Sequence, residues 1–426
     1  MARIKTDLPV IDKKFLVLIF IISLFLRILA IFLIKNYINP IDWENGIIAR
    51  NVIAGKGFSV QHYGPLGYTS WQAPFYPYFL AFFYKLLGIK THTFIIIEII
   101  QACISSFIPI IIYLTTLNIF KKKTAFISAI ILSGYPPLIW YCTRIHHTIF
   151  TAFLISLIVY LFTKIRLSPQ DFRNYVLSGI IIGVAMLVEP IIFVAVPFTL
   201  LWIYFAGKKR SEYTKGIAIM LISIAVIILP WTIRNYIVHK DLVFIKDSLG
   251  KEIYIGNNPN ATGTAYTKGG VHILKKYPPD FVEELSSLSE VDRDKKWLKS
   301  AISFIKKNPK RFVVLTAKKT FYYWWYPSND IVRHSYGGES VRYSGIKRIY
   351  WLLILCPALF GAVVSFRKIR EIGLIYIWIL TIPLPYIVTH VGQQRFRTII
   401  EPLIIIVAAY GIERIISLIL NKPAYD

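Results

Sequence analysis

The stretch of sequence that decides the fold lies close to the start of the chain. Residues 15–34 read FLVLIFIISLFLRILAIFLI, and Arg27 is the one charged residue among them. About 20 consecutive apolar residues are enough for a helix to cross the roughly 30 Å hydrocarbon core of a bilayer. The run lacks a small-residue cleavage site, which favours a retained span over a removable signal peptide. It therefore predicts an integral membrane protein.

The composition of the whole chain agrees with this prediction. The 426 residues are 55% hydrophobic, and their mean hydropathy is +0.55. The 49 Lys and Arg exceed the 23 Asp and Glu, which gives a net charge of +26. Because the basic residues cluster between apolar runs, lipid headgroups and polyanionic lipid substrates are favoured over nucleic acid as partners. Cys103, Cys142 and Cys356 have neither CxxC nor metal-ligand spacing, so no disulfide framework is expected.

Apolar stretches of spanning length recur along the chain. Two of them flank Glu189-Pro190, are short and follow directly on each other, so they are expected to form a bent hairpin. The predicted fold class is an all-α polytopic membrane protein with a bundle of about ten transmembrane helices. The ten stretches lie at about 15–35, 92–118, 124–141, 147–165, 174–189, 190–206, 216–233, 347–366, 372–390 and 398–419.

Basic residues in the short loops predict the orientation. Lys and Arg gather at alternating ends of the spans, and cytoplasmic loops are the ones enriched in them. A multi-pass plasma-membrane protein with both termini cytoplasmic is expected, with outer regions at about 36–91, 234–346 and 391–397. The chain then divides into an N-terminal transmembrane module at 1–233, the outer cap region at 234–346, and C-terminal transmembrane helices at 347–426.

The outer regions contain segments too short to span. Trp43–Ala54 and Pro74–Leu87 have helical spacing of apolar residues and are expected to lie along the membrane interface. Trp71 and Tyr76 would suit that position, because aromatic residues favour the interface. The cap region is expected to be small, α-rich and rich in loops, with a charged helix near 288–308.

The first outer loop carries an acidic pair, Asp42 and Glu44, directly after the first span. A carboxylate at a membrane surface can take a proton from an acceptor group as that group attacks, and Asp42 is available for this role. The alternative is structural, because an acid just ahead of a helical pattern can cap the helix and stabilise it by roughly 0.5–2 kcal/mol. The acidic pair alone leaves both interpretations open.

Flanking motifs add to this picture. An acid after the first span, a Gly-x-Gly-aromatic turn at 55–58, and a Trp…Pro-aromatic-Tyr-Pro-x-Phe-Leu-Ala stretch at 71–81 together resemble the glycosyltransferase family 39 proteins. These belong to the GT-C superfamily of polyprenyl-phosphate-sugar-dependent transferases. The resemblance spans nearly the whole chain, through Pro230-Trp231-Thr232-Ile233-Arg234-Asn235-Tyr236, Gly256-Asn257-Asn258-Pro259, Gln394-Arg395-Phe396-Arg397 and Glu401-Pro402.

The resemblance implies a GT-C-like bundle and a hexosyl- or pentosyltransferase of the cell envelope. By resemblance, Asp42 maps onto the family's proposed general base, and the transfer inverts the anomeric carbon as an acceptor displaces a polyprenyl phosphate. Glu44 would be a second catalytic contact or simply a first-turn helix residue. The sugar, the lipid length and the acceptor, whether lipid, protein or polysaccharide, are not encoded in these motifs.

Cations are needed near the leaving phosphate. Arg395 and Arg397, before the last span, and Arg234, at the outer end of the seventh, are the predicted donor-phosphate ligands. Each has an alternative role, since an arginine at this depth can also anchor lipid headgroups by snorkelling.

The chain departs from the family pattern near the start of the fourth span. Many members carry a second acid there, whereas this chain reads Arg144-Ile145-His146-His147-Thr148. His146 and His147 are therefore candidate contacts to acceptor or donor, as are Trp71 and Tyr76, although interfacial histidines can also be plain boundary residues. No ligand spacing for a metal is present, so no cofactor is assigned and a divalent metal is left open.

Two further functions compete with sugar transfer. Arg27, Glu98 and Glu189 lie inside or between spans, where charges are costly, and in a secondary transporter or lipid flippase they would line a pathway. The simpler interpretation is that Arg27 pairs with a carboxylate to hold the bundle together. Transporters often show inverted repeats, and no repeat is evident here. A glycan ligase or polymerase of the same superfamily would share the outer loops and the cationic site.

Overall fold

The structure, a computed structural model, describes residues 12–61, 65–206, 210–268, 271–273, 279–325, 341–390 and 394–420. These residues are helical almost throughout, and the prediction of an all-α polytopic fold is confirmed. The main departure from the predictions is a two-stranded hairpin within residues 36–91, the predicted first outer loop. Its strands β1 (Ser59–Gln61) and β2 (Leu66–Tyr68) pair antiparallel, with Val60 opposite Gly67.

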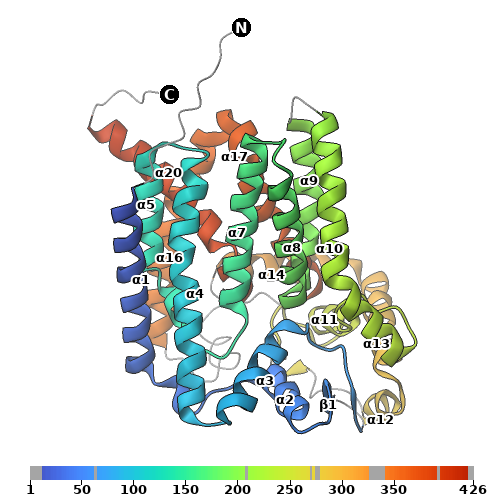
Figure 1. The fold of residues 1–426 in the computed structure, drawn as a ribbon. Coiled ribbons are helices and arrows are strands. Elements are labelled where there is room, and N and C mark those ends of the chain that lie inside the picture. The colour runs from blue at the N-terminus through green and yellow to red at the C-terminus, as the bar shows by residue number, and fades with distance from the viewer. Residues whose placement is uncertain are drawn as a thin grey trace.

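Long apolar helices form the body of the molecule and run roughly parallel to one another in Figure 1. They and their short extensions are α1 (Lys13–Ile34), α4 (Thr91–Leu117), α5 (Lys122–Ser133), α6 (Pro136–Cys142), α7 (Thr148–Leu167), α8 (Phe172–Val188), η2 (Pro190–Val194), α9 (Ala195–Ala206), α10 (Arg210–His239), α16 (Val341–Ser365), η4 (Phe366–Lys368), α17 (Ile369–Thr381), α18 (Pro383–Thr389) and α20 (Glu401–Ile419).

The number of spans depends on how broken helices are counted. Within the described residues, six helical segments are long and apolar enough to cross a membrane, or seven if the bent pair α5 and α6 is one span. The bend between these two helices is 43°. The expected count of about ten is higher because it also included the shorter helices on either side of Glu189 and divided the segment 346–389 in two. All ten predicted stretches nevertheless coincide with helices.

Burial separates central from peripheral helices. In α7, 78% of the apolar window is buried inside the protein, against 22% for α1 and 17% for α10. The outward faces of α1 and α10 carry exposed Phe25, Leu33, Ile222 and Val226. An apolar surface of this kind suits lipid, where helices satisfy their own backbone hydrogen bonds.

Helices α16 and α20 approach each other closely through small residues. A Cβ atom added to Gly361 would lie 2.1 Å from the carbonyl oxygen of Val407, and one added to Gly411 would lie 2.1 Å from that of Pro357. Glycines at both crossing points therefore let the two backbones touch, as is common between membrane helices. This contact joins the middle of α20 to α16.

The opposite end of the bundle from the start of α1 and the end of α20 carries the short elements (Figure 1). These are η1 (Asn36–Ile38), α2 (Trp43–Ile53), the hairpin, α3 (Phe75–Leu87), α11 (Leu249–Gly256), α12 (Pro279–Ser287), α13 (Glu290–Lys307), α14 (Pro309–Trp324) and α19 (Gln394–Thr398). The helices expected at Trp43–Ala54, Pro74–Leu87 and 288–308 are all present, within two residues of their predicted ends. Helix α10 runs through the boundary placed at 233/234 and ends at His239.

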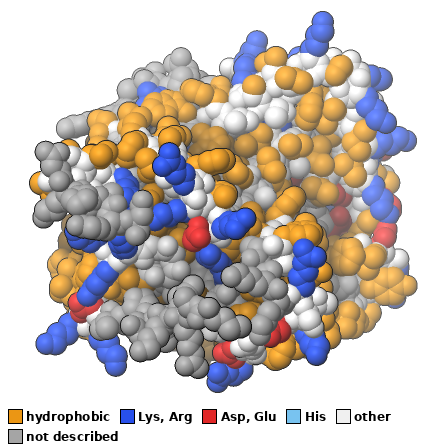
Figure 2. Space-filling model, turned by 90° about the horizontal axis from the view of Figure 1, so that it is seen from above, with side chains coloured by type: hydrophobic (Ala, Val, Ile, Leu, Met, Phe, Trp, Pro, Cys, Tyr) orange, Lys and Arg blue, Asp and Glu red, His pale blue; other side chains and the backbone are white. Residues whose placement is uncertain are grey.

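The face at the start of α1 is rich in basic side chains. Figure 2 views the molecule from above, and Lys and Arg outnumber Asp and Glu on the visible surface. The sequence analysis assigns this end to the cytoplasm, and that assignment remains a prediction.

Arg27 does not pair with a carboxylate, so that expectation was wrong. Its guanidinium donates to Ser105 Oγ at 2.9 Å, to the Ser23 carbonyl oxygen at 3.0 Å and to the Ser133 carbonyl oxygen at 2.9 Å. Hydroxyl and carbonyl acceptors from three helices thus hold the buried cation. Arg27 therefore still connects helices of the bundle, but through hydroxyl and carbonyl oxygens and not through a carboxylate.

Candidate functional site

Asp42 sits at the N-terminal end of α2 without capping it. Its side chain makes no hydrogen bond to the first turn of the helix. Instead, Arg50 donates to Oδ2 at 2.7 Å and to Oδ1 at 3.0 Å, and the Tyr84 hydroxyl donates to Oδ2 at 2.8 Å. Asp42 therefore occupies the N-cap position of α2 without making the capping hydrogen bond, and its side chain is held by side chains of α2 and α3. Glu44 lies in the first turn of α2 and is partly exposed.

Tyr76 and Trp71 lie inside the protein and not at an interface. Each is 1% exposed. The Tyr76 hydroxyl donates to Gln101 Oε1 at 2.9 Å, and the Tyr76 ring lies 6.1 Å from the ring of His147. Trp71 packs edge-on against Trp297 of α13, at 6.0 Å between ring centroids. Both aromatic residues join the first outer loop to other elements.

Arg234 fastens the first outer loop to α10. It donates to the Thr69 carbonyl oxygen at 2.7 Å and to the Phe58 carbonyl oxygen at 3.2 Å, and its guanidinium stacks over Trp231 at 4.7 Å. Glu290 of α13 completes the attachment by accepting from the Ser70 backbone N–H at 2.6 Å. Arg234 therefore holds the loop in place, and it does so with the same N–H groups that it would need to bind a phosphate.

Two histidine–carboxylate pairs lie near each other beyond α3. The first joins His147 Nε2 to Glu189 Oε2 at 3.0 Å, and the His146 ring stacks on His147 at 4.2 Å between centroids. Glu189 comes from the break between α8 and η2, where the chain is extended. The bent hairpin expected at Glu189-Pro190 therefore delivers a carboxylate to His147.

The second pair joins His390 Nδ1 to Glu252 Oε2, and Lys251 Nζ lies 3.0 Å from Glu252 Oε1. Burial alone would raise the pKa of the Glu252 carboxyl, but His390, Lys251 and Lys246 outweigh it and hold that pKa well below its usual range. Glu252 is therefore ionised at neutral pH. Lys251 also lies over the Trp71 ring at 3.9 Å, which links α11 to the first outer loop.

Lys246 and Arg395 lie between these two pairs. Both cations act electrostatically on Glu189, Lys246 also acts on Glu252, and Arg395 also acts on His390. Within the described part of the chain, neither cation has an ion-pair or hydrogen-bond partner, and Arg395 Nε is buried. We call this set the charged cluster; it comprises His146, His147, Glu189, Lys246, Lys251, Glu252, His390 and Arg395.

The charged cluster is reachable from outside. The side chains of His147, Glu189, Glu252 and His390 are between 13% and 23% exposed. Lys246 and Arg395 are partly exposed and form no ion pair among the described residues, so this arrangement favours binding of an anion. The two unpaired cations can supply charge-assisted hydrogen bonds to a phosphate.

Arg397 has quite different surroundings from Arg395. It is 1% exposed, donates to Glu401 Oε1 at 2.7 Å and to the Trp324 carbonyl oxygen at 2.8 Å, and stacks over Trp351 at 3.5 Å. Glu401 is fully buried. The guanidinium of Arg397 thus ties α14, α16 and α20 together around the loop that presents Arg395.

The motif Gly256-Asn257-Asn258-Pro259 explains how α11 reaches the cluster. Asn257 Nδ2 donates to the Val388 carbonyl oxygen at 3.0 Å, and its Oδ1 accepts from Lys319 Nζ at 3.2 Å. Lys319 also donates to the Val388 carbonyl oxygen, at 2.9 Å. These bonds dock the end of α11 on the end of α18, which places Glu252 beside His390.

Sequence reasoning missed Lys246, Lys251, Glu252 and His390. The signal that could have found the last three is their position beside family motifs: Lys251 and Glu252 precede Gly256, and His390 precedes the loop of Arg395. No motif in the sequence marks Lys246, because its role depends on electrostatic interaction with Glu189 and Glu252, which are not its neighbours in sequence.

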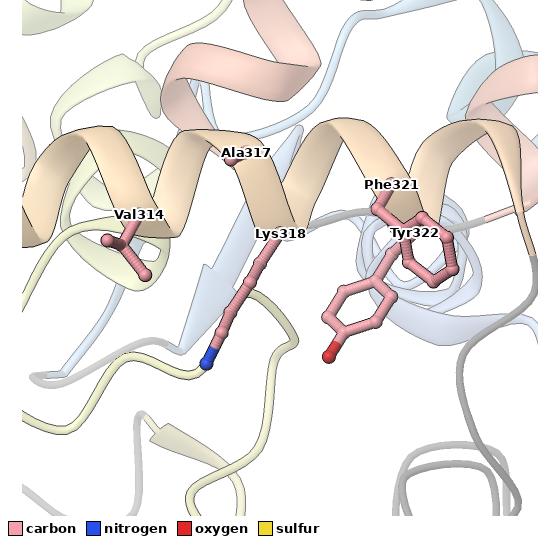
Figure 3. A pocket seen from close by; sticks show the side chains of 5 residues that line it. All are labelled: Val314, Ala317, Lys318, Phe321 and Tyr322. Carbon is pink, nitrogen blue, oxygen red and sulfur yellow. The ribbon is translucent and has the colours of Figure 1, made fainter.

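A shallow hollow lies elsewhere, on the exposed face of α14 (Figure 3). It is lined by Val314, Ala317, Lys318, Phe321 and Tyr322, which recur at helical spacing. Apolar carbon forms most of this surface, and the side chains of the charged cluster are absent from it. The hollow therefore does not extend the candidate site.

Comparison with known families tests the resemblance. The family described as dolichyl-phosphate-mannose-protein mannosyltransferase matches residues 71–233. This segment contains the Trp71 to Ala81 motif, the histidines and the outer end of the seventh predicted span. The resemblance to glycosyltransferase family 39 is confirmed for this segment, which does not include Asp42 or Arg395. A search of curated proteins found no match.

Solved structures of the oligosaccharyltransferase of Archaeoglobus fulgidus share this fold. One is tethered to an acceptor peptide containing an NVT sequon (TM-score 0.57, 16% identity, 97% of this chain and 50% of the other), and one is in complex with Zn and sulfate (0.57, 16%, 96% and 50%). A third, named AglB, holds an inhibitory peptide and a dolichol-phosphate (0.55, 16%, 97% and 52%). The chain spans about half the length of these proteins. It shares the fold of these oligosaccharyltransferases, and its long apolar helices are those of an integral membrane protein.

Proposed function

We propose that the protein is a membrane glycosyltransferase that moves a sugar from a polyprenyl-phosphate donor to an acceptor at the outer membrane face. The observation that carries the proposal is the pair of unpaired cations, Lys246 and Arg395, in a reachable cluster of a bundle with this fold. A lipid tail in the bilayer would bring its phosphate to that depth. The dolichol-phosphate in the archaeal oligosaccharyltransferase structure is consistent with such a donor.

The reaction is an inverting displacement. The acceptor heteroatom attacks the anomeric carbon, its proton passes to Asp42, and the bond from the anomeric carbon to the phosphate oxygen breaks. The electron pair of that bond leaves with the polyprenyl phosphate, whose growing charge Lys246 and Arg395 stabilise. His146 and His147 lie beside these cations and are placed to contact the sugar or its phosphate.

Helix α3 connects the two halves of this site. Tyr84 contacts Asp42 and Tyr76 contacts His147, and the two tyrosines are eight residues apart on one buried face. At 1.5 Å per residue, this separation is about 12 Å along the helix axis. The donor sugar would lie along α3, between the phosphate at the charged cluster and the base at Asp42. Glu44 would be a secondary contact at the outer edge.

Arg397 and Arg234 serve the same reaction by holding the loops. Their donors are used by carbonyl and carboxylate oxygens, so Arg397 presents the loop of Arg395 and Arg234 presents the loop that carries Asp42. In this assignment the direct phosphate ligands are Arg395 and Lys246.

A bound metal does not fit the residues of this site. Within the described residues, no group of three or more His, Cys, Asp or Glu side chains could hold a metal ion. Both oxygens of Asp42 accept hydrogen bonds from Arg50 or Tyr84, which leaves a carboxylate already neutralised by a cation. No step of the proposed reaction passes through a metal, although one related structure is a complex with Zn.

The test is an Asp42→Asn variant, assayed with a panel of polyprenyl-phosphate sugars and simple acceptors. A positioned general base contributes about 10²–10⁴-fold, so transfer should fall by roughly that factor. Binding of polyprenyl phosphate and the thermal midpoint Tm should stay close to those of the wild type. Full transfer activity in the variant would rule out Asp42 as the base, and a wild-type protein inactive with every donor would count against the whole proposal.

The matched control is Glu44→Gln, on the same turn of the same loop. It changes the charge by the same amount but removes a partly exposed acid. A much smaller loss of transfer is expected there. Equal losses in both variants would indicate that net charge at the membrane surface is responsible.

A further inference from the structure

Asp42 is surrounded by side chains that have no role in the proposed reaction as described above. Arg50 comes from the last turn of α2, eight residues after Asp42, and Tyr84 comes from α3. Together they donate three hydrogen bonds to one carboxylate. The donors reach the carboxylate from two helices and so fix its orientation.

The three bonds are shared unequally between the two oxygens. Oδ2 accepts from Arg50 at 2.7 Å and from Tyr84 at 2.8 Å, whereas Oδ1 accepts from Arg50 at 3.0 Å. An ionised carboxylate has about four acceptor positions, two on each oxygen. Oδ2 is therefore saturated, and within the described residues Oδ1 keeps one position open.

The backbone is shaped to permit this arrangement. A Cβ atom added to Gly46 would lie 1.8 Å from Asp42 Oδ2, so the side chain folds back over the first turn of α2 only because residue 46 has none. Trp43 adopts φ of +50°, which is unfavourable for a residue with a Cβ. Local strain of this kind persists where surrounding contacts fix the conformation.

Both partners keep their protons. The hydrogen bonds that Arg50 donates to Asp42 raise the pKa of the Arg50 guanidinium further above its usual value. Burial, together with the charge of Asp42, raises the pKa of the Tyr84 hydroxyl well above its usual range. Each remains a donor at any physiological pH, so neither can take the proton in place of Asp42.

We propose that Arg50 and Tyr84 are positioning residues for Asp42, and that they leave Oδ1 as the atom that receives the proton of the acceptor. The inference rests on the proposed function. The acceptor O–H or N–H bond breaks as its heteroatom bonds to the anomeric carbon, and the new O–H bond forms on Oδ1. Once Oδ1 carries the proton, the Asp42 carboxyl is neutral. Arg50 then has no ionic partner there, but its hydrogen bond to Oδ2 remains.

The test compares Arg50→Gln, Arg50→Lys and Tyr84→Phe with the wild type by kcat, KM and the pH profile of transfer. In Arg50→Gln, kcat should fall about tenfold to a hundredfold, because a base displaced by about 1 Å can lose that factor. The acid limb of the pH profile should move to higher pH, because removing a neighbouring cation favours the protonated carboxyl. The KM for the donor should change little, since the donor phosphate binds elsewhere.

Arg50→Lys separates charge from geometry. Lysine keeps the positive charge but cannot form the two parallel bonds of arginine. The acid limb should return towards its wild-type position while kcat stays low. Tyr84→Phe removes one neutral donor, and kcat should fall about threefold to tenfold.

Lys85→Gln is the control, because Lys85 is an exposed cation next to Tyr84 and has no contact with Asp42. Its kinetics should match the wild type. If Arg50→Gln lowers Tm and leaves kcat and the acid limb unchanged, Arg50 is structural and the inference is overturned. The inference is also overturned if the wild type is active on the donor panel and both Arg50→Gln and Tyr84→Phe have wild-type kinetics. The proposed function would stand in that case.

Discussion

Asp42 and Arg395 are charged side chains of two loops that are predicted to lie outside. They differ in whether neighbouring side chains form hydrogen bonds or ion pairs with them. Both oxygens of Asp42 accept hydrogen bonds from Arg50 or Tyr84. Within the described residues, neither Arg395 nor Lys246 has an ion-pair or hydrogen-bond partner, although Arg395 lies over the Phe396 ring at 4.7 Å. A satisfied carboxylate is held ready in one orientation, whereas an unsatisfied cation favours the arrival of an anion. The contrast separates a region built for proton transfer from a region built for binding.

The same contrast exists within a single loop. Arg397 follows Arg395 by two residues, and its guanidinium is met by Glu401, by backbone carbonyls and by the Trp351 ring. Both arginines had the same predicted role as phosphate ligands. Their surroundings differ because Arg397 faces the first turn of α20, where Glu401 lies four residues further on, whereas Arg395 faces the two histidine–carboxylate pairs.

The largest expected effect follows from this difference. Arg397→Ala leaves Glu401 buried and uncompensated, which should lower the free energy of unfolding by about 3–5 kcal/mol. The measurement is Tm and the yield of folded protein in detergent. Arg395→Ala should leave both close to the wild type, because Arg395 forms no ion pair or hydrogen bond with the described residues and its contact with the Phe396 ring contributes about 0.5–1 kcal/mol.

A second variant keeps this prediction testable if Arg397→Ala does not fold. Arg397→Met combined with Glu401→Leu removes both charges together, and apolar replacement of a buried pair is often neutral. Tm should recover in the double variant. An unchanged Tm in Arg397→Ala would show that the pair contributes little to stability and would weaken the division between the two arginines.

The next effect in size concerns donor binding. Arg395→Ala and Lys246→Ala should each weaken the binding of polyprenyl phosphate about tenfold to a hundredfold, because a hydrogen bond to a charged group contributes about 1.5–3 kcal/mol. The measurement is the Kd for polyprenyl phosphate of the purified protein, by titration. Both variants should keep the wild-type Tm.

Lys299→Ala and Arg173→Ala are the matched controls for this measurement. Lys299 is exposed on α13, and the Arg173 side chain is 87% exposed on α8. Neither belongs to the charged cluster, so the Kd should not change. A loss equal to that of Arg395→Ala would point to a general attraction between the basic surface and the anionic lipid.

Much of the fold could be predicted from the sequence because hydropathy is a local property. All ten apolar stretches coincide with helices, and the amphipathic segments at Trp43–Ala54 and Pro74–Leu87 are helical as expected. The hairpin β1–β2 was missed because each strand has three residues and neither shows an alternation of buried and exposed residues. The capping hydrogen bond considered for Asp42 does not form, because Arg50 and Tyr84 donate to its carboxylate instead. Both partners are distant in sequence, at 8 and 42 residues from Asp42.

The charged cluster was harder to predict because its pairs join distant parts of the chain. His147 and Glu189 are separated by the whole of α7 and α8, and Glu252 and His390 by most of the cap region and by α16, α17 and α18. No periodicity indicates which acid meets which histidine. Arg395 and the histidines could be proposed from the family motifs, but their environment follows from how α11 docks on α18.

The smallest expected effect contrasts two neighbours in sequence. Lys246 faces Glu189 and Glu252, whereas Asp247 is surrounded by other acids. Burial, followed by repulsion from Asp294, Glu290 and Asp241, raises the pKa of Asp247 to about 8.

A raised pKa makes the folded protein bind more protons than the unfolded chain between the two values, so stability should fall as pH rises through that interval. The contribution of Asp247 is fully present below about pH 4 and is lost as pH passes about 8. Asp247→Asn should therefore flatten the dependence of Tm on pH between 5 and 8, with the largest gain in Tm at the upper end. Asp292→Asn, which changes an exposed acid of the same region, should leave the slope unchanged. A wild-type slope in Asp247→Asn would mean that this acid is already ionised, and the repulsion that distinguishes it from Lys246 would then be too weak to matter.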